Sequence, residues 1–130
     1  MSKAAKTILL VDDDAEFTAA TRAVLESQGY DVAEAHSGAD GLAAARAKKP
    51  DLMILDVMMA SDTEGFDVSR AVKAEPALGG LPVILLTGMR REMNLPFALE
   101  PDPDHLPVKV VLEKPVPPAK LLEAVAQQIG

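Results

Sequence analysis

The stretch Asp51-Leu52-Met53-Ile54-Leu55-Asp56-Val57-Met58-Met59 decides the fold class of this chain. An uninterrupted apolar run from Leu52 to Leu55 ends in a carboxylate, Asp56, and apolar residues follow it. A short apolar run of this kind is typical of a strand that is buried on both faces, as in a parallel sheet. Because open α/β sheets bind their ligands at the carboxyl ends of the strands, Asp56 is the first candidate for a functional residue.

The composition indicates one domain with an aliphatic core. The chain has 130 residues, of which 48% are hydrophobic but only 3% aromatic. That length is sufficient to bury a stable core without additional stabilisation by disulfides or bound metals. The absence of cysteine excludes disulfides, thiolate catalysis and cysteine-ligated metals. We therefore expect a single domain over residues 1–130, without a separate output domain.

Charge and hydropathy restrict the location and the partners. The formal net charge of −7 argues against the phosphate backbone of a nucleic acid as a direct partner. No run approaches the roughly 20 apolar residues that a membrane helix needs. The residues before Ile8 do not resemble a signal peptide. These features predict a cytoplasmic protein that does not insert into membranes and does not bind nucleic acid directly.

Four further runs have the length and character of strands, namely 7–11, 30–35, 82–86 and 110–112. The run 7–11 is wholly apolar after its first residue and predicts a central strand, whereas 30–35 alternates and predicts a strand nearer the sheet edge. Helical patterns separate the strands at 15–28, 37–48, 65–74 and from 117 onward. This alternation predicts a parallel α/β sheet with right-handed crossovers and helices on both faces.

Particular residues mark the helix ends and faces. Asp14 and Ser37 stand where an N-cap is needed, and Gly29 is a natural stop for the first helix. We expect the apolar face of the first helix to comprise Phe17, Ala20, Val24 and Gln28, with Thr21 and Leu25 flanking it. The last helix begins at Pro117-Pro118, and its expected stripe is Leu122, Val125 and Ile129.

The segment Met89–Lys109 interrupts the alternation of strands and helices. It contains four prolines, at Pro96, Pro101, Pro103 and Pro107. Proline inside a helix removes a backbone donor and clashes with the preceding turn. A fourth helix is therefore short, or a proline-rich loop replaces it.

Polar residues stand at the carboxyl ends of the expected strands: Asp12, Asp13, Asp56, Thr87 and Lys114. These ends share one edge of a parallel sheet, so we expect the side chains to converge. Three carboxylates in one place repel one another and favour a cation. Oxygen ligands without histidine or cysteine suit Mg²⁺. A lysine and a hydroxyl at the same edge can hold the oxygens of a phosphoryl group.

Four motifs, in this order, resemble the signatures of response regulator receiver domains: Leu10-Val11-Asp12-Asp13-Asp14, Leu55-Asp56-Val57-Met58-Met59, Thr87-Gly88 and Lys114-Pro115. The resemblance covers nearly the whole chain. It implies a flavodoxin-like, doubly wound sheet of five parallel strands in the order 2-1-3-4-5. It also implies a phosphorylation-dependent switch of a two-component or phosphorelay system that signals by protein–protein binding. Such a domain is not an enzyme beyond catalysing its own aspartyl phosphorylation and dephosphorylation.

The same resemblance implies roles for the site residues. Asp56 accepts a phosphoryl group from a phosphohistidine of a sensor histidine kinase or a histidine phosphotransfer protein. Lys114 pairs with the phosphoryl oxygens, and Thr87 hydrogen-bonds to one of them. The implied Mg²⁺ ligands are Asp13, Asp56, the backbone carbonyl of Met58 and, through a water, Asp12. The downstream protein target is unknown.

Some positions depart from the family pattern. Val111 stands where receivers usually carry an aromatic switch residue, so we expect Met89–Lys109 to carry the readout instead. Met58 and Met89 stand where side chains influence the hydrolytic water, and neither can orient a water. Slow self-dephosphorylation is therefore expected.

Two other functions remain open from the sequence. Asp12-x-Asp14 also fits the start of a haloacid dehalogenase-like phosphatase, with Asp12 as nucleophile and Asp14 as general acid, but this function leaves Asp56 unexplained. A pseudo-receiver would bind partners without phosphorylation, and its expected mark is a lost acid or lysine. Finally, His36 and His105 are expected to be solvated loop residues.

Overall fold

The computed structural model describes residues 6–56, 64–78, 80–87, 110–113 and 116–129, without the side chains of 64–67 and 113. Its strands are β1 (Thr7–Val11), β2 (Asp31–Ala35), β3 (Leu52–Asp56), β4 (Val83–Thr87) and β5 (Val110–Glu113). Its helices are α1 (Ala15–Glu26), α2 (Gly38–Lys48), α3 (Glu64–Ala74), the short 3-10 helix η1 (Pro76–Leu78) and α5 (Pro118–Ile129). The segment Met89–Lys109, where the fourth helix was in question, lies outside the described residues.

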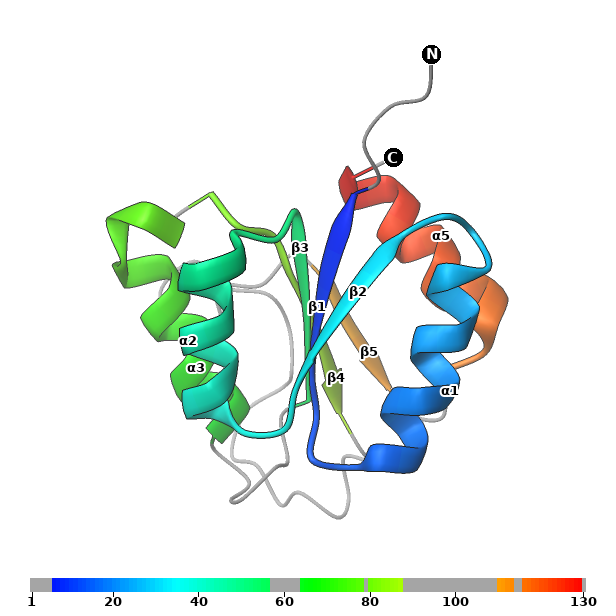
Figure 1. The fold of residues 1–130 in the computed structure, drawn as a ribbon, viewed down its shortest axis with the longest axis horizontal. Coiled ribbons are helices and arrows are strands. Elements are labelled where there is room, and N and C mark those ends of the chain that lie inside the picture. Colours follow the sequence, from blue (N-terminus) through cyan, green and yellow to red (C-terminus); the bar gives the residue numbers. More distant parts are fainter. Residues whose placement is uncertain (1–5, 57–63, 79, 88–109, 114–115, 130) are drawn as a thin grey trace.

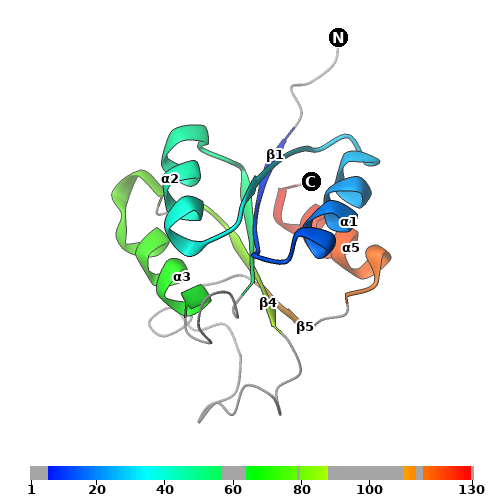
Figure 2. The same ribbon diagram turned by 60° about the horizontal axis from the view of Figure 1, so that its bottom comes forward.

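The five strands form one parallel sheet in the order β2-β1-β3-β4-β5. Helices α1 and α5 cover one face, and α2 and α3 cover the other (Figures 1 and 2). This arrangement confirms the flavodoxin-like fold, the central place of β1 and the edge position of β2. The carboxyl ends of the strands lie at the bottom of Figure 1 and come forward in Figure 2.

The apolar strands contribute side chains to two aliphatic cores, one on each face of the sheet, because successive strand residues point to opposite sides. The strand residues on the α2–α3 side include Leu9, Val11, Met53, Leu55, Val83 and Leu85. Those on the α1–α5 side include Ile8, Leu10, Leu52, Ile54, Ile84 and Leu86. All five residues of β3 are buried, which is why its sequence shows no polar alternation.

The two expected N-caps are confirmed. The Asp14 carboxylate accepts hydrogen bonds from the backbone N–H groups of Glu16 and Phe17, and Ser37 caps α2. After α1 the backbone reverses through Gly29, whose φ of 89° is in the left-handed region that favours glycine.

The expected face of α1 is wrong by part of a turn. Thr18, Thr21 and Leu25 are the buried residues of this helix, whereas Ala20 is exposed. Thr18 can be buried because its hydroxyl donates to the Asp14 carbonyl at 2.8 Å, so that its polar atom is satisfied. The helix also ends at Glu26, before Gln28.

The stripe of α5 is correct in part. Val125 is buried as expected, but the other buried residues are Leu121 and Ala124. Leu122 and Ile129 are half-buried at the margin of the same core. The centre of the buried face therefore lies one residue before the expected stripe.

Helix α2 approaches β1 closely at Gly41. A Cβ at this position would lie 2.9 and 3.0 Å from the two methyl carbons of Val11. Since Val11 is fully buried, its methyl groups have little room to move. The absence of a side chain at Gly41 thus sets how closely α2 packs over the end of β1.

Candidate acidic site at the carboxyl edge of the sheet

The strand register brings the candidate residues to one edge. Val11 pairs with Leu55, so Asp12 and Asp56 follow on neighbouring strands. Asp56 in turn pairs with Leu86, the residue before Thr87 on β4. Residues that are distant in sequence thereby meet at the central strands, as expected for a parallel sheet.

Asp12, Asp13 and Asp56 form a compact acidic cluster. One carboxylate oxygen from each lies within 4.8 Å of the others. Asp12 and Asp56 are buried, at 3% and 5% exposed, while Asp13 is exposed. Like charges at this distance destabilise one another, and hard oxygen donors without nitrogen or sulfur fit Mg²⁺ or a similar cation. The expectation that these three acids converge is confirmed.

Local hydrogen bonds hold the turn that carries two of these acids. The Asp12 carboxylate accepts from the backbone N–H of Asp14 at 2.9 Å. The Asp12 N–H donates to the Ala35 carbonyl at 3.0 Å, which ties the turn to the end of β2. Because Asp14 caps α1, the turn is held at the helix as well as at the sheet.

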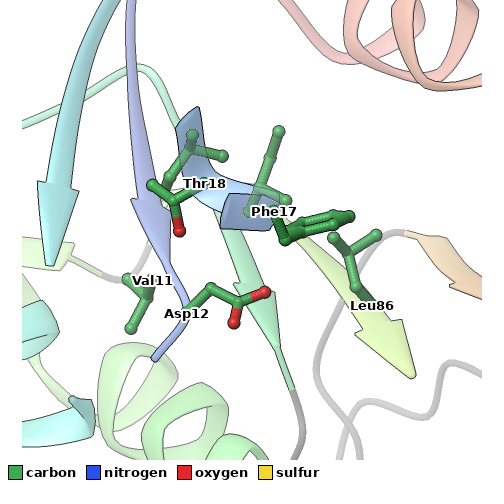
Figure 3. Close-up of a pocket in the computed structure, with 7 residues that line it drawn as sticks. Val11, Asp12, Phe17, Thr18 and Leu86 are labelled. Atoms are coloured by element: carbon green, nitrogen blue, oxygen red, sulfur yellow. The ribbon is translucent and has the colours of Figure 1, made fainter. Parts of the chain in front are cut away.

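An apolar recess lies beside the Asp12 side chain (Figure 3). The Phe17 ring, from the first turn of α1, stands next to Leu86 of β4, above the Asp12 carboxylate in this view. The recess has no room for a water molecule. Aliphatic and aromatic groups therefore close the α1 side of the acidic cluster.

The structure places some of the expected site residues and not others. Thr87 is buried at the end of β4. Lys114 and Met58 lie outside the described residues, as do Met89 and His105. Lys114 directly follows Glu113, whose backbone pairs with Thr87.

His36 is exposed and lies between β2 and α2, as expected for a solvated loop residue, but it also makes a contact that was not predicted from the sequence. Its ring nitrogen Nδ1 lies 3.0 Å from the backbone oxygen of Asp12, although the side chain is 53% exposed. On its other side, Nε2 is 3.6 Å from a carboxylate oxygen of Glu34. The sequence contains only half of the signal, namely that His36 directly follows β2. The other half is that β2 neighbours β1, which ends at Asp12.

Arg22 links this part of β2 to α1. It donates to Glu34 at 2.7 Å and to Glu26 at 3.1 Å. These hydrogen bonds, the one to Glu34 first, raise the pKa of Arg22, so the guanidinium stays charged. Arg22 thus orients the carboxylate that stands beside His36.

Comparison with known proteins identifies the family. Residues 8–126 match the model described as "Response regulator receiver domain". The chain belongs to the response regulator receiver domain family. Receiver domains are signalling modules, and they generally bind Mg²⁺ at an acidic pocket. The resemblance carried by the four sequence motifs is therefore confirmed.

Relatives of this receiver domain include longer proteins. Transcriptional regulatory protein AfsQ1 from Streptomyces coelicolor is 38% identical over 105 residues, which are 81% of this chain and 45% of that protein. DNA-binding response regulator MtrA from Mycolicibacterium paratuberculosis is 32% identical over 122 residues, 94% of this chain and 50% of that protein. The chain thus spans about half the length of these curated relatives.

A solved structure supports the same assignment over nearly the whole chain. The CheY-like response regulator receiver domain protein from Methanospirillum hungatei JF-1 superposes with a TM-score of 0.75 and 29% identity. The match covers 95% of this chain and 93% of that one. The receiver fold and its strand order are thereby established for this chain.

The geometry also bears on the phosphatase alternative. The Asp14 carboxylate accepts hydrogen bonds from the backbone N–H groups of Glu16 and Phe17 in α1, at 3.0 and 3.1 Å. Asp14 therefore acts as a helix cap, whereas the phosphatase function needs it as a general acid. The family match over residues 8–126 agrees with the receiver function.

Proposed function

We propose that this receiver domain is a phosphorylation-dependent switch of a two-component or phosphorelay system, with Asp56 as the phosphoryl acceptor. The convergence of Asp12, Asp13 and Asp56 within 4.8 Å, at the end of the central strand β3, carries the proposal. Asp56 is the member of this cluster that extends directly from β3. Asp56 pairs with Leu86 of β4, and the preceding residue, Leu55, pairs with Val11 of β1.

The proposed chemistry is a phosphoryl transfer between side chains. A carboxylate oxygen of Asp56 forms a bond to phosphorus while the phosphorus–nitrogen bond of a phosphohistidine breaks. The imidazole leaves with the electron pair and takes up a proton. Catalysis in such a transfer rests on positioning and on electrostatic stabilisation.

In this proposal Mg²⁺ would be held by Asp12 through a water, by Asp13, by Asp56 and by the backbone carbonyl of Met58. When bound, it neutralises negative charge on the acceptor and on the phosphoryl group. The chain itself supplies the remaining groups, with Lys114 pairing with the phosphoryl oxygens and Thr87 hydrogen-bonding to one of them. The buried place of Thr87 at the end of β4 is consistent with this role.

The proposed partners are a sensor histidine kinase or a histidine phosphotransfer protein, and a downstream protein target. MtrA is named as DNA-binding, but this chain spans only half of that protein. The net charge of −7 opposes contact with a phosphate backbone. We therefore propose that the receiver domain itself does not contact DNA.

No helix in the described part of the chain could span a membrane. We propose a cytoplasmic location.

Phosphorylation with a small donor tests the acceptor. The protein is incubated with acetyl phosphate and Mg²⁺, its intact mass is measured, and the modified residue is mapped. We expect one phosphoryl adduct on Asp56, lost in Asp56→Asn and retained in Asp31→Asn, a matched control at an exposed position on β2. No adduct on the wild type would favour a pseudo-receiver, and an adduct on Asp12 would favour the phosphatase.

Two further proposals concern the phosphorylated state. Val111, a half-buried aliphatic residue on β5, stands where receivers usually carry an aromatic switch residue. We therefore assign the readout of phosphorylation to Met89–Lys109. Hydrogen exchange that is unchanged across this segment on phosphorylation would contradict that assignment. Met58 and Met89 cannot orient the hydrolytic water, so we expect slow self-dephosphorylation. A half-life of seconds for the phosphorylated protein in a phosphate-release assay would exclude it.

A further inference from the structure

The backbone of Asp12 is tied to the end of β2 at both of its polar groups. Its N–H donates to the Ala35 carbonyl, and its carbonyl oxygen lies 3.0 Å from Nδ1 of His36. A carbonyl oxygen can only accept, so the ring nitrogen carries the proton in this contact. In a continuing parallel ladder the donor to this carbonyl would be the backbone N–H of Ser37. Among the described residues, the last backbone bond of this ladder is the one from the Asp12 N–H to the Ala35 carbonyl. The contact of the His36 ring with the Asp12 carbonyl lies one step beyond it.

This bond acts on the peptide unit that joins Asp12 to Asp13. Because the peptide is planar, holding the Asp12 carbonyl also sets the orientation of the Asp13 N–H and the position of its Cα. The far side of the turn is held by the bond from the Asp14 N–H to the Asp12 carboxylate, at 2.9 Å. The position of the exposed Asp13 is therefore set by the hydrogen bonds of its two neighbours, Asp12 and Asp14.

The His36 ring lies beside a carboxylate that is held from α1. Glu34 stands 3.6 Å from Nε2, and Glu34 accepts a hydrogen bond from Arg22 at 2.7 Å. The side chain of His36 is 53% exposed and lies outside both apolar cores. Its removal therefore changes the support of the turn without opening a cavity.

We propose that His36 is a positioning residue for the metal site of this receiver domain. The hydrogen bond from Nδ1 to the Asp12 carbonyl holds Asp12 and Asp13 so that their carboxylates face the same cation as Asp56. His36 acts through the backbone and is not a metal ligand. The inference rests on the proposed function, because it requires that the acidic cluster bind Mg²⁺.

Titration with MgCl₂, followed by backbone amide NMR shifts, tests the role of the ring. His36→Ala removes the donor, and we expect the Mg²⁺ dissociation constant to rise about 10-fold, the usual effect of removing a group that orients a ligand. His36→Asn carries an amide nitrogen as many bonds from Cα as Nδ1 and should bind Mg²⁺ nearly as the wild type does. His36→Gln places that nitrogen one bond further out and should resemble His36→Ala.

Two controls separate positioning from general stability. All three variants should unfold at nearly the wild-type temperature without Mg²⁺, since the ring is outside the core. Nitrogen-15 spectra of the wild type, at a pH where the ring is neutral, should show the proton of His36 on Nδ1. A proton on Nε2 instead would overturn the inference.

The outcomes distinguish this inference from the proposed function. A wild type that binds no Mg²⁺ overturns the metal site and the inference together. Binding that Asp13→Asn abolishes and His36→Ala leaves unchanged overturns the inference alone. Equal weakening in His36→Ala and His36→Asn would also overturn it, because the hydrogen bond would then not be the cause.

Discussion

At the scale of single residues, the role of an acid depends on the bonds it makes. Asp12, Asp13 and Asp14 are consecutive, yet Asp14 caps α1 while the other two join Asp56. The division could be predicted from the sequence, because a helix starts directly after Asp14 and a strand ends directly before Asp12. The role of His36 could not be predicted in this way. Its contact depends on which strand neighbours β1, and sequence spacing alone does not contain that information.

Substitution of Asp14 tests its assignment as a cap. Asp14→Ala leaves the N–H groups of Glu16 and Phe17 without their side-chain acceptor, and should lower the free energy of unfolding by about 1 kcal/mol. Asp14→Ser keeps a capping oxygen and should recover most of the loss. Urea denaturation measures both. Phosphorylation of Asp56 should persist in each variant, and its loss in a folded Asp14→Ser protein would contradict a purely capping role.

At the scale of elements, the strands were easier to predict than the helix faces. Four of the five strands are mainly apolar runs and β2 alternates, and the observed limits of all five lie within one residue of those expected. Helix α1 combines alanines with two buried threonines, and alanine fits either a buried or an exposed face. The hydrophobic pattern therefore does not fix the rotation of α1. Burial of Thr18 depends on its bond to the Asp14 carbonyl, which hydropathy does not report.

The two leucines of α5 test the observed face of that helix. Leu121 is buried at 4% exposed, whereas Leu122 is half-buried. Leu121→Ala should cost about 2–5 kcal/mol of unfolding free energy, as is usual for a buried leucine. Leu122→Ala removes the same atoms from a partly solvated position and should cost clearly less. Equal losses in urea denaturation, or a larger loss for Leu122→Ala, would contradict the rotation described for α5.

The contact between Gly41 and Val11 can be measured by a double-mutant cycle. Alanine at 41 improves helix propensity by about 1 kcal/mol, but its Cβ meets the Val11 methyl carbons at 2.9 and 3.0 Å. Overpacking of this kind costs about 1–3 kcal/mol. Gly41→Ala should therefore destabilise the wild type and stabilise a Val11→Ala background. Additive effects in the cycle would show that the two positions do not interact.

At the scale of the whole molecule, the fold places three acids where they oppose stability. The sheet gathers three carboxylates within 4.8 Å in a chain that already carries a net charge of −7. Two unit charges at such distances repel by about 1 kcal/mol even in water. The apolar cores on both faces of the sheet must offset this repulsion. The acidic cluster should therefore link the stability of the domain to divalent cations.

Removal of one acid should separate stability from cation binding. Without Mg²⁺, Asp13→Asn relieves repulsion at an exposed position and should raise the free energy of unfolding by an amount on the order of 1 kcal/mol. For the wild type, Mg²⁺ at 100 times its dissociation constant should add about 2.7 kcal/mol, because it binds the folded state alone. Asp13→Asn should lose most of that gain, whereas Asp31→Asn should keep it. Thermal and urea unfolding with MgCl₂ or EDTA measure these differences. If Mg²⁺ stabilised Asp13→Asn as much as the wild type, Asp13 would contribute nothing to Mg²⁺ binding. Since Asp13 is the most accessible acid of the cluster, the cation would then be bound elsewhere.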